Sequence, residues 1–205
     1  MVLVLGIIAG WLAGLVRSWI TGKPYRVPEL SKVWLVFFAV IPQLLVFQIP
    51  FTSGWFSDGW AAGVLVASQL VLLVFIWFNR DKLGMKILGV GLALNLLVIA
   101  LNKGLMPISP ETVLALYPEM PISAWQIGFR PGRSKNILLP AGDTRLAWLS
   151  DSILLPEWFP WARALSLGDL VIVLGVVWLL AVENPGETAE VYKPAEEPLL
   201  GRKSI

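Results

Sequence analysis

The sequence contains no cysteine and no histidine among its 205 residues. Without cysteine, disulfide bridges, thiol catalysis, iron–sulfur clusters and zinc–thiolate sites are excluded. Without histidine, the chain lacks the usual haem ligand, the commonest zinc ligand and the usual general base. We therefore predict no metal site, and the remaining residue types do not identify a cofactor.

Charged residues are also scarce. They make up 15% of the chain, whereas about a quarter of the residues of soluble domains are charged. The formal net charge is only +2, and the basic residues are dispersed between apolar runs. Because a nucleic-acid surface needs clustered Lys and Arg or a recognisable motif, we predict no nucleic-acid partner.

Apolar residues are abundant, at 57% of the chain, and they gather in long runs. A helix needs roughly 20 mostly apolar residues to cross the hydrocarbon core of a bilayer. The runs predict an all-α integral membrane protein of about five transmembrane helices, in the cell membrane with the lipid bilayer around it. The expected helices lie near residues 2–20, 32–50, 60–78, 84–102 and 166–183.

The distribution of Lys and Arg predicts an orientation. Basic residues occur in the loops after the first and third helices, for example Arg26 and Arg80, whereas the 51–59 loop has none. By the positive-inside rule, the first and third loops face the cytoplasm. The N-terminus is then expected outside and the C-terminus in the cytoplasm.

The segment 103–165 is rich in proline and glycine, and no part of it is apolar enough to span a membrane. We expect it to fold as an outer, Pro-rich extramembrane cap between the fourth and fifth helices, with 136–139 as a short extended piece. The bundle with this cap would occupy 1–183. The polar composition of 184–205 predicts a cytoplasmic tail.

Two short patterns predict helix starts at the edges of the cap. Ser109 suits an N-cap, Pro110 the first helical position and Glu111 the positive end of the helix dipole. Ser166 followed by Asp169 is the S-x-x-D form of a capping box. Met106 and Pro107, just after the fourth helix, complete a predicted hinge between bundle and cap.

Polar side chains inside the expected spans form a candidate binding cluster of Gln43, Gln69, Asn95 and Asn102. Asn95 and Asn102 differ by only about 20° around an ideal helix, so they face the same side. Such amides either bond neighbouring helices or line a pocket for a small molecule or lipid headgroup. Pro42 should kink the second helix, and Gln43 could satisfy the carbonyl that the kink frees.

Two glycine ridges predict close helix packing. Gly6, Gly10 and Gly14 share one face of the first helix, and Gly59 and Gly63 share one face of the third. Small residues at this spacing let helix backbones approach closely. The ridges could pack within one bundle, or support self-association or docking of another membrane protein.

Three longer patterns resemble one known family. The first is N-x-L-V-I-x-x-N-x-G-x-M-P-I-S-P-E, from Asn95 to Glu111. The second is T-x-L-x-x-L-x-D, ending at Asp151, and the third is S-x-G-D, ending at Asp169. Together they resemble the DUF5317 family of small bacterial multi-pass membrane proteins, from the first helix to about Leu180. The resemblance implies an architecture but no chemistry, because the family has no known function.

The leading functional hypothesis is a non-enzymatic accessory or scaffold subunit of a larger membrane assembly. The alternative is a small-molecule or lipid-binding membrane protein or transporter, with a polar pocket among the second to fourth helices. Enzymatic activity is left open and disfavoured, because no catalytic motif is visible and no catalytic residue can be named. An enzyme would need two of Asp143, Asp151 and Asp169 in one cleft.

Overall fold

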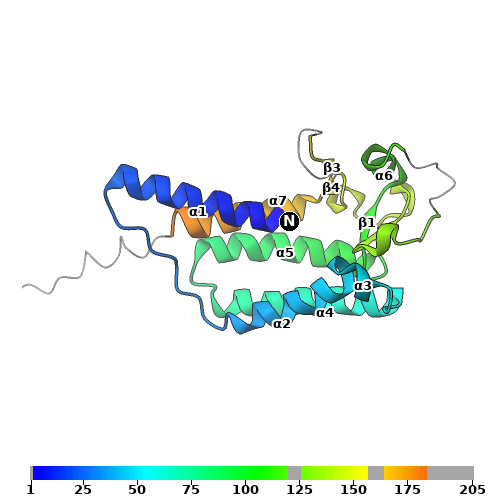
Figure 1. The fold of residues 1–205 in the computed structure, drawn as a ribbon, viewed down its shortest axis with the longest axis horizontal. Coiled ribbons are helices and arrows are strands. Elements are labelled where there is room, and N and C mark those ends of the chain that lie inside the picture. The colour runs from blue at the N-terminus through cyan, green and yellow to red at the C-terminus, as the bar shows by residue number, and fades with distance from the viewer. Residues whose placement is uncertain (1, 120–125, 157–163, 184–205) are drawn as a thin grey trace, which may run out of the picture.

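The computed structural model describes residues 2–119, 126–156 and 164–183, so the predicted tail, 184–205, lies outside the described residues. The α-helices are Val2–Thr21 (α1), Trp34–Gln43 (α2), Pro50–Ser53 (α3), Asp58–Phe78 (α4), Leu83–Leu101 (α5), Pro110–Leu116 (α6) and Leu167–Ala181 (α7) (Figure 1). The long helices lie within a few residues of the five apolar runs, because each run is bounded by polar or turn-forming residues.

Three of these helices, α1, α4 and α5, are long and apolar enough to cross a membrane. The helical stretch Trp34–Gln48 and α7 are apolar but shorter, at 15 residues each. Their length is about 22 Å at 1.5 Å per residue, against a hydrocarbon core of about 30 Å. The described chain is thus mostly helical with three such helices, and its apolar helices are compatible with a membrane location.

The second helix changes character at Pro42. Helix α2 ends at Gln43 and continues as a π-helix, η1 (Leu44–Gln48). Proline cannot donate a backbone hydrogen bond, so a change of helical register beside it is expected. The side chain of Gln43 bonds a neighbouring helix, because its Nε2 donates to Ser68 Oγ of α4 at 2.6 Å. Gln43 therefore ties α2 to α4.

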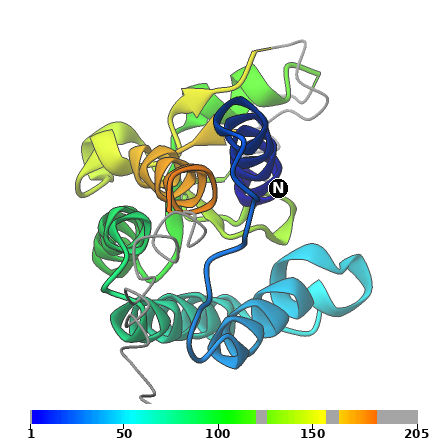
Figure 2. The same cartoon turned by 90° about the vertical axis from the view of Figure 1, so that its left-hand side faces the viewer.

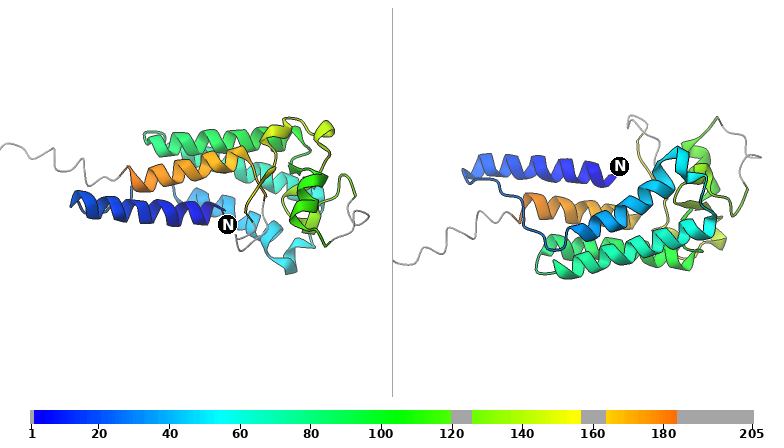
Figure 3. Two further views of the ribbon diagram at one scale, coloured as in Figure 1. Left: turned by 90° about the horizontal axis from the view of Figure 1, so that it is seen from above. Right: turned by 60° about the horizontal axis from the view of Figure 1, so that its bottom comes forward.

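The helices pack in the spatial order α1, α7, α5, α4, α2. Figure 2, which looks along the helices, shows this series as a curved row with α1 and α2 at its two ends. The connection from α1 to α2 runs at the end of the bundle opposite the cap (Figure 3). The short loop from α4 to α5 lies at that same end (Figure 1).

The first glycine ridge packs inside the chain. A Cβ added at Gly6 would meet Val173 at 3.4 Å, and one at Gly10 would meet the Val177 Cα at 3.0 Å. Gly14 faces the Tyr25 ring and the Leu180 carbonyl oxygen. The alternative that this ridge packs within one bundle, against α7, is therefore confirmed.

The second ridge differs, because a Cβ at Gly59 or Gly63 would meet nothing within 4 Å. The closest helix approach involves glycines that the sequence reading did not single out. At Gly84, Gly91 and Gly175, an added Cβ would lie 2.5–2.8 Å from backbone atoms of the facing helix, α7 or α5. These glycines allow α5 and α7 to touch backbone to backbone.

The cap is not wholly helical, so the all-α expectation is wrong there. Strand β1 (Met106–Ile108) pairs in parallel with β2 (Asn136–Leu138), and β3 (Ile153–Leu154) pairs antiparallel with β4 (Ala164–Leu165). The predicted extended piece is thus confirmed as β2. The short 3-10 helices η3 (Pro131–Arg133), η4 (Ala141–Asp143) and η5 (Ala147–Leu149) connect these parts.

A buried apolar cluster joins the cap to the ends of α4 and α5. Its members are Leu65, Val98, Ile99, Leu105, Met106, Ile137, Leu139 and Leu149. Because the cluster includes side chains from both parts, cap and bundle share a hydrophobic core. The polar site described next lies at this junction.

Candidate functional site

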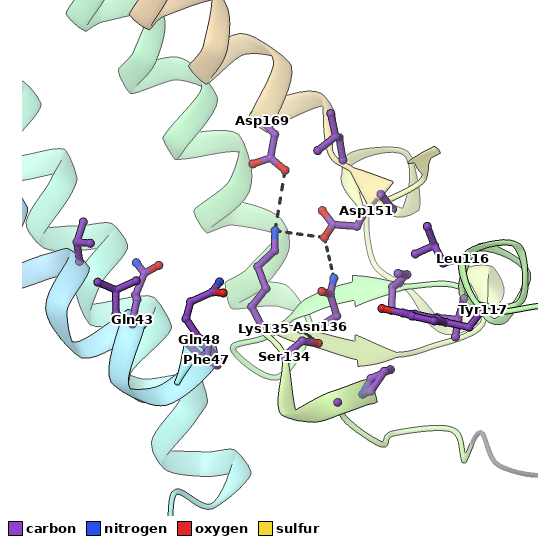
Figure 4. A pocket seen from close by; sticks show the side chains of 18 residues that line it. Gln43, Phe47, Gln48, Leu116, Tyr117, Ser134, Lys135, Asn136, Asp151 and Asp169 are labelled. Atoms are coloured by element: carbon purple, nitrogen blue, oxygen red, sulfur yellow. Dashed lines mark hydrogen bonds and ion pairs between the residues drawn. The ribbon is translucent and has the colours of Figure 1, made fainter. Parts of the chain in front are cut away.

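A cavity of about 510 Å³ lies where the cap meets the bundle. One wall comes from α2 and η1, and the other comes from the cap and the start of α7 (Figure 4). Its polar lining residues are Gln43, Gln48, Tyr117, Ser134, Lys135, Asn136, Asp151 and Asp169. Pockets of roughly 300–1,000 Å³ are of the size that holds small molecules.

Three charged side chains converge on this cavity. The Lys135 ammonium lies 3.2 Å from Asp151 Oδ2 and 3.9 Å from Asp169 Oδ2 (Figure 4). The first distance allows a charge-assisted hydrogen bond, whereas the second is an ion pair only. Asn136 Nδ2 also donates to Asp151 Oδ2, at 2.7 Å. One ammonium therefore forms ion pairs with two carboxylates that lie 18 residues apart in the sequence.

Strand β1 positions two of these groups through its backbone. The Met106 N–H donates to the Lys135 carbonyl oxygen at 3.0 Å, and the Asp151 N–H donates to the Pro107 carbonyl oxygen at 3.1 Å. Met106 and Pro107, the predicted hinge residues, are therefore buried parts of a strand. The backbone of this strand therefore bonds both Lys135 and Asp151.

Asp151 is the most deeply buried charged group of the cluster, with its side chain 3% exposed. Its Oδ2 accepts from Lys135 and Asn136, whereas its Oδ1 is buried and has no hydrogen-bond partner. Burial raises the pKa of the Asp151 carboxyl above its ordinary value, and Lys135 opposes this rise. Because buried unpartnered oxygens are costly, Oδ1 is an acceptor that a further donor would satisfy.

The predicted capping box at the start of α7 is confirmed. The Asp169 N–H donates to Ser166 Oγ at 3.0 Å, and the Ser166 N–H donates to Asp169 Oδ2 at 3.3 Å. Asn95 of α5 bonds both residues of this capping box. Its Nδ2 donates to Asp169 Oδ1 at 2.9 Å, and its Oδ1 accepts from Ser166 Oγ at 2.8 Å. Asn95 fits because Gly168 has no side chain to collide with its amide oxygen.

The other predicted helix start is confirmed as well. Ser109 caps α6 and accepts from the Thr112 N–H at 3.2 Å, with Pro110 in the first turn. Glu111 is exposed, and hydrogen bonds from its own backbone N–H and from Ser109 lower the pKa of its carboxyl. These residues shape the cap beside the cavity but do not line it.

The four amides of the candidate cluster do not come together. Gln43 lines the cavity and bonds α4, whereas Asn95 bonds the start of α7. Asn102 bonds Arg145, donating to its carbonyl oxygen at 2.9 Å and accepting from its N–H at 3.0 Å. Gln69 of α4 does not line the cavity, and its buried Oε1 has no partner. The two asparagines therefore bond different segments, although they share a helix face.

Several site residues were not identified from the sequence. Lys135, Asn136 and Ser134 belong to the basic stretch RSKN, whose composition suits any polar loop. Arg130 is buried and donates from Nη1 to Asp58 at 2.9 Å and from Nε to the Ser134 carbonyl oxygen at 3.1 Å. This arginine ties the loop before β2 to the start of α4 and so supports the cavity wall.

The site places charged side chains and hydrogen-bonding amides around a space of the size of a small molecule. Asp151 and Asp169 both line the cavity, which is the convergence that an enzyme would need, whereas Asp143 is exposed in η4. Lys135 contacts both carboxylates, so the pair is arranged to hold a cation. Among the described residues, no group of three His, Cys, Asp or Glu side chains is placed to hold a metal ion.

Comparison with known proteins places the chain in a family without a described chemistry. A protein of Thermotoga maritima, described as uncharacterised, is 26% identical over 158 residues, covering 75% of this chain and 82% of that protein. No solved structure matches the chain. The family model of DUF5317 matches residues 28–181, which span β1, the cavity and most of the helices but leave α1 outside. The chain therefore belongs to DUF5317, a family of unknown function.

Proposed function

We propose that this chain is a multi-pass membrane protein that binds a small molecule in the cavity between its helical bundle and its cap. In this proposal the five apolar helical stretches all cross the membrane, including the shorter Trp34–Gln48 and α7. The exposed apolar surface supports this. On α1, for example, Ile8, Trp11 and Leu12 are each about half exposed. Apolar surface of this extent is unfavourable in water and suited to lipid.

The proposed orientation places the cap outside and the opposite end of the bundle in the cytoplasm. The loops that contain Lys23, Arg26, Arg80 and Lys82 lie together at the end away from the cap (Figure 1). Short loops with excess Lys and Arg favour the cytoplasmic side. Labelling of single cysteines introduced into this cysteine-free chain, at Ser31 and at Ala141, would test the orientation in intact cells.

The observation that carries the binding proposal is the buried carboxylate of Asp151 in the wall of the cavity. Burying a charged group costs free energy unless partners compensate it. Here the partners are present on one oxygen only, and the lining also supplies amides from Gln43, Gln48 and Asn136. A cavity with an apolar wall and a few convergent polar groups is typical of a ligand site.

A substitution that fills the cavity tests this proposal. Leu44 lines the cavity and is 44% exposed, so Leu44→Trp should occupy part of the space without disturbing the buried core. Leu45, 39% exposed, does not line the cavity, and Leu45→Trp is the matched control. A compound that raises the unfolding temperature of the wild type and of Leu45→Trp, but not of Leu44→Trp, would support the proposal. Equal effects on all three proteins would contradict it.

An accessory or scaffold role is a second candidate, supported by the open ridge at Gly59 and Gly63. A Cβ at either position would meet nothing within 4 Å, so the ridge has room for the approach of another helix. The partner would be another membrane protein or a second copy of this chain. Mass measurement after purification in mild detergent tests this role. A partner that is lost in Gly63→Leu supports it, and a monomer without any partner contradicts it.

A further inference from the structure

We propose that the cavity binds a molecule with a protonated primary amine and a short apolar group, whose ammonium takes the place of Lys135 between Asp151 and Asp169. This inference rests on the proposed function, because it names the class of ligand for the same cavity. The Lys135 side chain would then be an internal occupant that the ligand displaces.

The two carboxylates form a site that already fits an ammonium group. Their oxygens lie 3.2 Å and 3.9 Å from the Lys135 Nζ, on two different parts of the chain. Two carboxylates face one ammonium, so the cluster favours positive charge in its centre. The Oδ1 of Asp151 is buried without a partner, so this carboxylate keeps an unused acceptor, and an ammonium has three N–H donors.

In this proposal the two carboxylates stay in place and the Lys135 ammonium is the group that leaves. Asp151 is held by Asn136, and Asp169 is held by Asn95 and by the Ser166 backbone. Their side chains are 3% and 21% exposed, whereas the Lys135 side chain is 38% exposed. A lysine has a flexible four-carbon stem, so its ammonium can move into solvent while the carboxylates keep their geometry.

The opposite wall of the cavity supplies the apolar surface against which the proposed apolar group of the ligand would pack. Val40, Leu44 and Phe47 of α2 and η1 line the cavity across from the charged cluster. A hydrocarbon group on the ligand would bury apolar area against these residues, at roughly 25 cal/mol per Å². An anionic ligand fits less well, because an anion at Lys135 would lie beside both carboxylates and be repelled by them.

The test uses three four-carbon probes that differ in head group and charge: n-butylamine, butyrate and 1-butanol. Binding to the full chain in nanodiscs of zwitterionic lipid is measured by calorimetry for the wild type, Lys135→Met and Asp151→Asn. Lys135→Met removes a tethered competitor of high effective concentration, so it should bind butylamine about tenfold more tightly than the wild type. Asp151→Asn should lose butylamine binding, and butyrate and butanol should bind to none of the three.

The possible failures are distinguishable. Butylamine affinity that is unchanged or lost in Lys135→Met overturns the displacement of Lys135, and butyrate binding that requires Lys135 shows an anion site instead. In either case, if Leu44→Trp blocks the binding of the probe, the proposed function still holds. If none of the probes binds to any variant, the amine inference fails, and the compound screen with Leu44→Trp decides the proposed function separately. The wild type gives a test that does not depend on the folding of any variant. It must bind butylamine saturably and must not bind butyrate, and any other result overturns the amine inference.

Discussion

The contact between α5 and α7 makes Gly175→Ala the most informative single substitution outside the cavity. A Cβ at Gly175 would lie 2.5 Å from the Leu88 backbone nitrogen and 2.8 Å from the Gly84 carbonyl oxygen. Both are backbone atoms of a helix, so neither can rotate away as a side chain could. The two helices would have to separate, and the Asn95 bond to Asp169 bridges the same interface.

The expected magnitude follows from two opposing effects. Overpacking of a tight interface costs typically 1–3 kcal/mol, and contact with rigid backbone favours the upper end, about 3 kcal/mol. Replacing glycine by alanine within a helix stabilises by about 1 kcal/mol. The net loss is therefore about 2 kcal/mol. For a chain of this size it lowers the unfolding midpoint by roughly 4–8 °C.

Gly63→Ala is the matched control, because a Cβ there meets nothing within 4 Å. Only the helix-propensity gain remains, so its midpoint should rise by roughly 2–4 °C. The measurement is thermal unfolding of both variants and the wild type in the same detergent. If Gly175→Ala and Gly63→Ala shift the midpoint in the same direction and by the same amount, the close approach of α5 and α7 does not exist.

Three further predictions concern the residues in and around the cavity. Asn95→Leu should lower the free energy of unfolding by about 1–3 kcal/mol, because it leaves buried polar partners unsatisfied. Gln69→Leu removes an unpartnered buried oxygen and should not lower it. Equal losses of stability in denaturant unfolding would refute this. Arg130→Ala should lower the free energy of unfolding by about 2 kcal/mol and make the cap more sensitive to protease. Asp58→Asn changes an ion pair whose carboxylate is 67% exposed, so it should lower that free energy by less than about 1 kcal/mol. A larger loss in Asp58→Asn than in Arg130→Ala would count against these hydrogen bonds. Because burial raises the pKa of Asp151, its stabilising contribution is complete below its unfolded pKa of about 3.9 and is lost as pH rises through the folded pKa. The midpoint of the wild type should thus fall relative to Asp151→Asn as the pH is raised from about 4 to about 9, and parallel curves would exclude this effect.

Much of the local structure could be predicted from the sequence. The apolar runs placed the long helices within a few residues, because a membrane-type helix is bounded where its apolar residues end. The capping box of Ser166 and Asp169 and the N-cap at Ser109 were also predictable, since each depends on residues within one helical turn. The same local patterns carried the resemblance to the family that the comparison established.

The candidate site could be predicted only in part. Gln43 and Asp169 were named from their positions in or beside apolar runs, and both line the cavity. Asn95 and Asn102 were also named, but the partners that they bond outside α5 lie in the segment after α6, far along the chain. A helical pattern gives the face of a side chain, and it does not give the segment that packs on that face.

Only the tertiary structure decided which charges meet. Lys135, Asp151 and Asp169 lie in three separate segments, and no periodicity relates them. They converge because β1 pairs with β2 and binds the Asp151 backbone, while the glycines of α5 and α7 bring the start of α7 against α5. The sequence by itself determined the helices, their ends and the absence of cysteine and histidine chemistry, because these depend on composition and near neighbours. The buried carboxylates and their shared lysine depend on long-range contacts, which form only when the whole chain packs.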